Sequence, residues 1–175
     1  MKRITIMLTL ALICALVGFA KNQKSDAAKD WMDQWKIGAD QLLRVAEAMP
    51  AEKYDYKPVK EVNNFSEQLK HTGIAMRVLL ANAEGKKVEL KEVALDNLKT
   101  KEEIIAELRK IVGEGAAVIN RVTGKTDGDV VESQFFGKTT RRFLLMQAIA
   151  HNNNHYGQLV YFLRLNGITP PGSGG

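Results

Sequence analysis

Hydrophobic side chains recur every three or four residues along four stretches of this chain, which is the spacing that buries one face of an α-helix. The first stretch covers residues 25–49 and stops at Pro50. The fourth covers residues 140–165 and is followed directly by Asn166 and Gly167. Proline ends a helix because it lacks a backbone N–H, and glycine commonly follows the last helical turn. The pattern therefore predicts a helix near each end of the domain.

The two middle stretches, residues 65–83 and 101–122, each begin with the same capping signal. A side chain that can cap a helix precedes a glutamate by three residues, and the pairs are Asn64 with Glu67 and Thr100 with Glu103. In such a capping box each side chain accepts a hydrogen bond from the backbone N–H of the other residue. Both stretches are therefore predicted to be helices with defined first turns.

No stretch of the sequence alternates convincingly between apolar and polar residues, so no β-strand is predicted. Residues 85–99 form a connector that is far longer than a turn between antiparallel helices requires. Fully extended, it could reach on the order of 50 Å, so the second and third helices could run parallel. Residues 124–138 are predicted to form a second long loop near one end. The predicted fold class is all-α, a four-helix bundle with one long crossover connection.

The N-terminus has the pattern of a secretory signal peptide. Lys2 and Arg3 precede an apolar run over residues 4–19, and the small residues Gly18 and Ala20 lie at the −3 and −1 positions that signal cleavage requires. We expect cleavage after Ala20, export to the periplasm or the extracellular space, and no stable membrane association afterwards. The alternative is an uncleaved membrane anchor, although the apolar run is at the short limit for a bilayer span.

The remaining composition narrows the function. We expect residues 1–20 to be the signal peptide, residues 21–170 the bundle and residues 171–175 a disordered tail. The only cysteine, Cys14, leaves with the signal, so metal ligands would be nitrogen or oxygen atoms. The net charge of +5 comes from interleaved acidic and basic residues, whereas a nucleic-acid-binding protein concentrates its basic residues. We expect no nucleic-acid partner.

All three histidines fall on two predicted helices, His71 on the second and His151 with His155 on the fourth. Residues four apart project from one helix face, so both imidazoles of the pair can reach one ion. His71 would complete three nitrogen ligands, a number typical of catalytic zinc sites that leave a position for water or substrate. The alternative is a coincidence of unrelated histidines. We favour the metal site.

Several polar residues near the histidines are candidates for supporting roles. Asn154 and Gln158 each follow one of the paired histidines by three residues and could orient a ligand or hold a water. Asn152 and Asn153 are predicted to lie on a solvated face. Glu67 lies one turn before His71 and is a candidate ligand, acceptor for an imidazole N–H or catalytic general base. A purely structural role for Glu67 in the capping box is an equally good interpretation.

Three segments of the sequence resemble a known family. Residues 151–159 read HNNNHYGQL, residues 161–167 read YFLRLNG, and Pro170 and Pro171 follow. Upstream, residues 54–58 read YDYKP and residues 65–71 read FSEQLKH. Together they resemble the DinB family of DinB/YfiT-like metalloenzymes, whose hallmark is H-x-x-x-H-x-G-Q followed by a Y-x-x-R-x-x-G-x-x-P ending. The resemblance covers essentially the whole chain after the predicted signal peptide.

The resemblance implies an up-down-down-up four-helix bundle with a divalent ion, zinc or nickel, held by His71, His151 and His155. Relatives include transferases and isomerases that use small thiol cofactors, and many others have no established activity. We therefore expect a metal-dependent hydrolase or a thiol-dependent transferase with a small-molecule substrate, and we allow for a homodimer. Export argues against a thiol cofactor, because such thiols are scarce outside the cytoplasm. The alternative function is a non-catalytic exported bundle that binds or senses metal.

Overall fold

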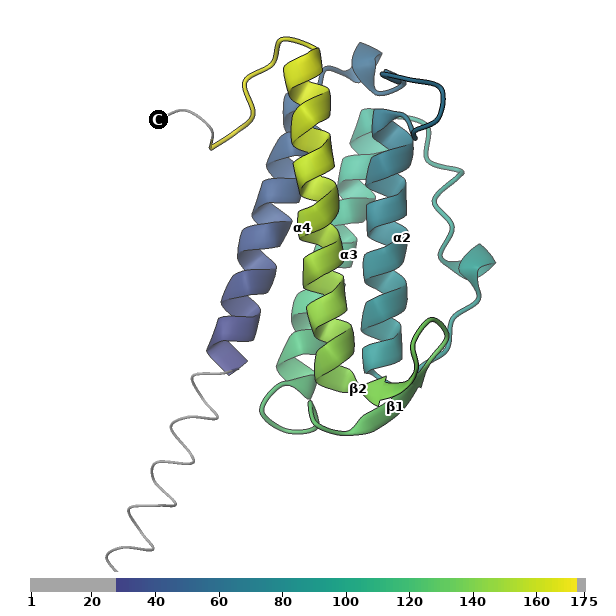
Figure 1. Ribbon diagram of the computed structural model, residues 1–175, viewed down its shortest axis with the longest axis vertical. Helices are drawn as coiled ribbons and strands as arrows, with labels where there is room; N and C mark the ends of the chain where they lie inside the picture. Colours follow the sequence, from purple (N-terminus) through teal and green to yellow (C-terminus); the bar gives the residue numbers. More distant parts are fainter. Residues whose placement is uncertain (1–27, 173–175) are drawn as a thin grey trace, which may run out of the picture.

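The computed structural model describes residues 28–172, and four helices packed side by side dominate it (Figure 1). The helices are helix 28–48, α2 (Phe65–Ala83), α3 (Lys101–Val122) and α4 (Arg141–Leu165). Helix 28–48 and α4 run in one direction, while α2 and α3 run in the opposite direction (Figure 1). This arrangement confirms the predicted up-down-down-up bundle.

Local capping fixes where the helices begin, as predicted. The Asn64 side chain accepts a hydrogen bond from Glu67 N at 2.8 Å, and Glu67 Oε2 accepts one from Asn64 N at 2.8 Å. Thr100 and Glu103 form the same capping box at the start of α3. At α4, the Thr140 side chain accepts a hydrogen bond from the backbone of the first turn. Because each cap satisfies backbone N–H groups that a helix leaves free, the sequence alone defines these starts.

A long crossover makes α2 and α3 parallel. It leaves the end of α2, follows the outside of the bundle through the short 3-10 helix η2 (Leu90–Glu92), and reaches the other end, where α3 begins (Figure 1). Val93 and Leu95 are buried against the bundle, and Lys70 Nζ donates a hydrogen bond to Leu98 O at 2.6 Å. A second 3-10 helix, η1 (Ala51–Lys53), lies in the connection between helix 28–48 and α2.

The predicted loop over residues 124–138 is wrong in part, because a β-hairpin forms there and continues to the start of α4. Strands β1 (Val130–Ser133) and β2 (Gly137–Thr140) pair antiparallel, with Val130 opposite Thr140. Each strand has only four residues, too few for an alternating pattern to be recognised. A contact with a distant residue holds the hairpin in place, since Ser133 Oγ donates a hydrogen bond to Oδ1 of the fully buried Asn82 on α2 at 2.9 Å.

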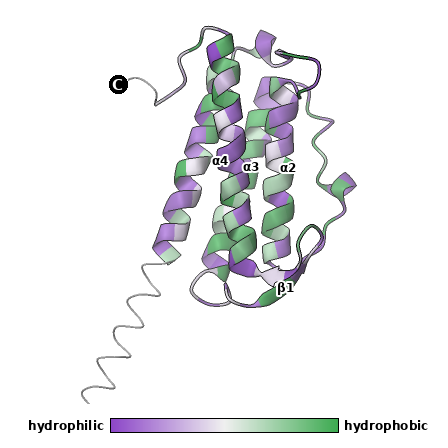
Figure 2. Cartoon of the chain, viewed as in Figure 1, coloured by the Kyte–Doolittle hydropathy of each residue, from purple (hydrophilic) through white to green (hydrophobic). Residues whose placement is uncertain are grey.

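The core lies between the four helices, and each helix presents hydrophobic and hydrophilic residues in alternation along its length (Figure 2). Trp35 shows how closely helix 28–48 and α3 approach. Its ring is buried over Gly115, where an added Cβ would lie 2.1 Å from the ring, and its Nε1 donates a hydrogen bond to Val112 O at 3.0 Å. Only glycine fits under this ring, so Gly115 sets the spacing between the two helices.

Two predictions concern segments that fall outside the described residues. The signal peptide over residues 1–20 lies there entirely, and so does most of the tail over residues 171–175. Cleavage and export stay predictions, which intact-mass analysis for a new N-terminus at Lys21 would test. Within residues 28–172, none of the helices is long and apolar enough to cross a membrane.

Candidate metal centre

The antiparallel helices α2 and α4 bring the three histidines together. The ring centroids of His71 and His151 are 5.2 Å apart, those of His71 and His155 are 4.8 Å apart, and those of His151 and His155 are 4.3 Å apart. One nitrogen from each ring lies within 4.8 Å of the other two. The spacing of four residues places the pair on one face of α4, and His71 faces it from α2. The predicted group is confirmed as one that could hold a metal ion.

The three rings differ in burial, and one of them carries a nitrogen without a partner. His71 is exposed, His151 is partly buried and His155 is buried. Within residues 28–172, the buried Nε2 of His151 has no hydrogen-bond partner. Buried polar atoms are rarely left unpaired, and a divalent ion bound by imidazoles would satisfy this one. Three neutral nitrogen donors fit zinc or nickel, whereas calcium and magnesium prefer oxygen donors.

Burial also keeps two of the imidazoles in the form that binds metal. It lowers the pKa of His151 to about 4, and the nearby charges of His155 and His71 act in the same direction. Burial and the charge of His71 likewise lower the pKa of His155, while a hydrogen bond with Gln158 opposes the shift. Only the deprotonated imidazole nitrogen is a ligand. At neutral pH, His151 and His155 therefore need not release a proton before they bind an ion.

Gln68 is part of the site, although it was not predicted. It is 5% exposed, its Nε2 is in close contact with His155 Nδ1, and it donates a hydrogen bond to Gln158 Oε1 at 2.7 Å. Gln158 Nε2 in turn donates to Asn154 Oδ1 at 3.4 Å. The contact with Gln68 occupies the Nδ1 edge of His155, which leaves Nε2 as the nitrogen available to an ion. Gln68 precedes His71 by three residues, so helical spacing alone could have placed it on the same face.

The amides of Gln68, Gln158 and Asn154 form one chain of contacts that ends at His155. Of the two predicted supporting residues, Gln158 contacts Gln68 directly, and the exposed Asn154 is joined to it through Gln158. Glu67, the candidate base, is exposed, and its carboxylate accepts the hydrogen bond from Asn64 N. Among the described residues, no carboxylate joins the histidine group, so a role for Glu67 in the chemistry stays a proposal.

The prediction for the two middle asparagines is right for Asn153 and wrong for Asn152. Asn153 is exposed, but Asn152 is only 3% exposed. Helix 28–48 covers Asn152 because Gly38 carries no side chain there. An added Cβ at Gly38 would lie 2.8 Å from Asn152 Nδ2. Because this contact joins two distant helices, the local sequence around Asn152 could not reveal it.

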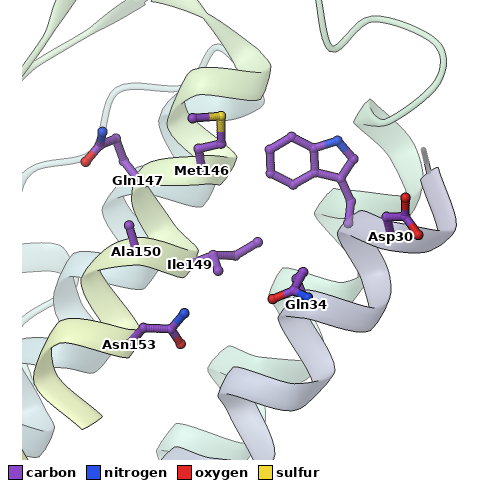
Figure 3. A pocket seen from close by; sticks show the side chains of 8 residues that line it. Asp30, Gln34, Met146, Gln147, Ile149, Ala150 and Asn153 are labelled. Atoms are coloured by element: carbon purple, nitrogen blue, oxygen red, sulfur yellow. The ribbon is translucent and has the colours of Figure 1, made fainter. Parts of the chain in front are cut away.

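A pocket of about 390 Å³ opens beside the histidines, and both His71 and His151 line it. Its other walls come from α2, α4, the crossover and the hairpin turn. A second pocket, of about 500 Å³, lies between helix 28–48 and α4 and is lined by Gln34, Ile149 and Asn153 among others (Figure 3). None of the histidines lines the second pocket. The histidine group is therefore open on one side to a cavity that can hold a small molecule.

Comparisons with known proteins agree with this fold. A DinB-like protein from Bacillus cereus has a similar structure, with a TM-score of 0.71, 19% sequence identity, and 82% of this chain and 95% of that chain covered. The DinB-like protein YjoA from Bacillus subtilis gives a TM-score of 0.68 at 20% identity, with 82% and 96% covered. None of the curated proteins matches the sequence. The family model described as the DinB superfamily matches residues 34–159, and the chain therefore belongs to the DinB superfamily.

Proposed function

We propose that the protein is a metal-dependent enzyme in which His71, His151 and His155 hold one divalent ion, zinc or nickel, beside a small-molecule substrate. The observation that carries the proposal is the opening of the histidine group onto a pocket. Structural metal sites are closed by their protein ligands, whereas catalytic sites have three protein ligands and an accessible position. The opening of the histidine group onto the pocket favours a catalytic site over a structural one.

The residues around the site have separate tasks in this proposal. A bound divalent ion lowers the pKa of a water or thiol that it holds and polarises a substrate carbonyl. His151 and His155 supply neutral nitrogens, and Gln68 holds the His155 ring in one orientation. The only cysteine of the chain is Cys14, so no described residue offers a thiol. The nucleophile is therefore water, which makes the protein a hydrolase, or an external thiol, which makes it a transferase.

Metal analysis and substrate screening test the proposal together. Protein purified without a histidine tag should contain about one zinc or nickel ion per chain. Esters, amides and thiol conjugates are then screened with and without added thiols, and the turnover found should disappear on chelation and return with the ion. If the metal-loaded protein binds and converts none of these compounds, the non-catalytic metal-binding or sensing bundle is correct instead.

The variant Glu67→Gln tests whether Glu67 acts as a base in the reaction. Glutamine can still accept the hydrogen bond from Asn64 N in the capping box, but it cannot take a proton as a base. We propose that Glu67 is the base of a hydrolase, so ester or amide turnover should fall by about a hundredfold with metal content and Tm unchanged. Glu103→Gln makes the same change in the capping box of α3 and is the control. Unchanged turnover in Glu67→Gln would remove Glu67 from the mechanism.

A further inference from the structure

The pocket beside the histidines has a composition that restricts what it can bind. Apart from His71, His151 and Gln147, the residues that line it are all apolar, and none is charged. Building on the proposed function, we propose that this pocket binds the uncharged apolar part of the substrate, a short acyl chain or an aromatic ring. The neutral polar group that reacts then lies at the histidines.

Residues of α2 form one wall of the pocket, and their order along the helix indicates how a bound molecule would extend. His71, Ile74, Ala75, Val78 and Leu79 line it, and their spacing of three and four residues places them on one face of the helix. The histidine is at one end of this row, and the other residues continue toward the hairpin end of α2. A molecule with its polar group at the histidines would therefore extend its remaining part over an apolar surface.

Two loops add large apolar side chains at the surface to the lining of the pocket. Leu90 of η2 is 53% exposed, and Phe135 and Phe136 in the hairpin turn are 57% and 44% exposed. Single exposed apolar residues are common, but a contiguous group around a cavity marks a binding site. Here residues that are distant in sequence line the same pocket.

The hairpin turn is anchored, so the position of its phenylalanines is built into the fold. Asn82 Oδ1, on the buried side of α2, accepts hydrogen bonds from Ser133 Oγ at 2.9 Å and from Gln134 N at 3.2 Å. The ring of Phe136 packs edge to face against Phe143 of α4, with 5.2 Å between the centroids. These contacts hold the turn beside the pocket and keep its apolar side chains there.

Gln147 is the one polar side chain of the pocket apart from the histidines. It lies one turn before His151 on α4 and lines the pocket of Figure 3 as well, and its amide makes no hydrogen bond with any residue from 28 to 172. It can therefore donate to or accept from a neutral polar group of the substrate. A charged tail would lose its hydration without finding a partner, which is unfavourable. The volume of about 390 Å³ is near the lower end for small-molecule sites, which suits a compact substrate.

Hydroxamates with different tails test the proposal on the zinc-loaded protein by calorimetry. Acetohydroxamate, hexanohydroxamate and adipic monohydroxamate share one metal-binding group, and the last two differ by a terminal carboxylate. Each buried methylene group is worth roughly fourfold in affinity, so hexanohydroxamate should bind at least about 30-fold more tightly than acetohydroxamate. Adipic monohydroxamate should lose most of this gain.

Two variants locate the apolar contact. Phe136→Ala should reduce the 30-fold ratio of the hexanohydroxamate and acetohydroxamate affinities to below about fivefold. Tyr161→Ala removes an exposed aromatic side chain of α4 outside the pocket and should leave this ratio unchanged.

The experiment distinguishes a failure of the proposed function from a failure of the pocket proposal. Acetohydroxamate reports only on the ion and its open position, so its failure to bind would contradict the proposed function. Equal affinities for the acetyl, hexanoyl and carboxylate-bearing compounds would overturn the pocket proposal and leave the proposed function intact.

A measurement on the metal-free protein keeps the pocket proposal testable without the ion. Hexanamide is titrated while the methyl groups of isoleucine, leucine and valine are observed by NMR. The methyl signals of Ile74, Val78 and Leu90 should shift. Shifts confined to Ile149 would place the ligand in the pocket of Figure 3 and overturn the proposal, as would the absence of any shift.

Discussion

Helix α2 meets its two neighbours in different ways. Toward α3 the contact is close at Gly73, where an added Cβ would lie 3.1 Å from both Leu108 and Ile111. Arg77, also on α2, pairs with Glu107 of α3 at 2.6 Å. Toward α4 the contact contains buried amides, three imidazoles and one side of an apolar pocket. The side of α2 that faces α3 is therefore closely packed around Gly73, and the side that faces α4 carries the candidate metal site.

This difference shows where the stability and the chemistry of the domain reside. Closely packed apolar side chains stabilise a fold, whereas buried polar groups without complete partners and open cavities do not. Departures from well-packed, fully paired structure are expected at functional sites. The packing around Gly73 should therefore contribute to stability without affecting metal binding, whereas the histidine group between α2 and α4 should determine metal binding. Changes to one face should leave the other nearly unaffected.

The largest expected effect follows removal of a ligand. His151→Ala should weaken metal binding by at least about a thousandfold, roughly 4 kcal/mol, because one of three protein ligands is lost. A competition titration against a coloured chelator measures the change. The metal-free variant should be at least as stable as the parent, because the unpartnered Nε2 is gone. Asn153→Ala, an exposed neighbour on α4, is the control. Full metal content in the His151→Ala, His155→Ala double variant would exclude this site.

A change on the side of α2 that packs against α3 should lower stability and leave metal binding nearly unchanged. Leu108 is fully buried beside Gly73, so Leu108→Ala should lower the free energy of unfolding by about 2–5 kcal/mol. Urea denaturation of the metal-free protein measures this loss. Under conditions where the variant is folded, its metal Kd should stay within about threefold of the parent value. A tenfold weaker Kd would mean that the two faces of α2 are coupled.

A smaller effect is expected from the amide that orients His155. Gln68→Met keeps the volume of the side chain but removes its hydrogen-bonding groups. Loss of such an orienting contact typically weakens metal binding by about 10- to 100-fold. A His155 that binds the ion through Nε2 carries its proton on Nδ1. Gln68→Glu would place a carboxylate oxygen beside Nδ1, where the amide nitrogen now lies, and this oxygen can accept a hydrogen bond from the Nδ1–H, so the variant should retain most of the affinity. The same competition titration compares the two variants, and equal affinities would show that Gln68 only fills space.

The sequence predicted the four helices and their starts because the signals for both are local. The stripe of apolar residues and the capping box of Asn64 with Glu67 each depend on residues within one or two turns. The hairpin could not be predicted in the same way, since its short strands depend on the contact between Ser133 and the distant Asn82. A four-residue strand has too little pattern of its own.

In the candidate site, too, the sequence predicted the features that depend on local spacing and missed those that depend on distant contacts. The histidines were found because a spacing of four residues fixes two of them, and His71 was the only histidine left to complete the group. Gln68 could have been found from its spacing to His71. The burial of Asn152 could not, because it depends on the absence of a side chain at Gly38. The apolar pocket was also beyond the sequence, since its walls come from helices, crossover and hairpin together.

The smallest effect expected is on the pH dependence of stability in the metal-free protein. A histidine in the unfolded chain has a pKa of about 6.5, whereas the pKa of the folded His151 is about 4. Above pH 6.5 neither form is protonated, so stability does not change. Between pH 6.5 and 4 the unfolded chain binds a proton that the folded protein does not, so stability falls as the pH is lowered. Below about pH 4 both forms are protonated and the effect saturates.

Because His151 is only partly buried, the loss attributable to it should be on the order of 1–2 kcal/mol. Urea denaturation of the chelator-treated protein at several pH values between 7 and 4 measures it. His151→Gln removes this titration, so the difference between parent and variant isolates it from the carboxylates that also titrate near pH 4. The pKa of His155 is lowered as well, so a weaker dependence of the unfolding free energy on pH should remain in the variant. Identical slopes in both proteins would mean that the α2–α4 face does not disfavour charge at His151, and the contrast between the two faces of α2 would then rest on metal binding alone.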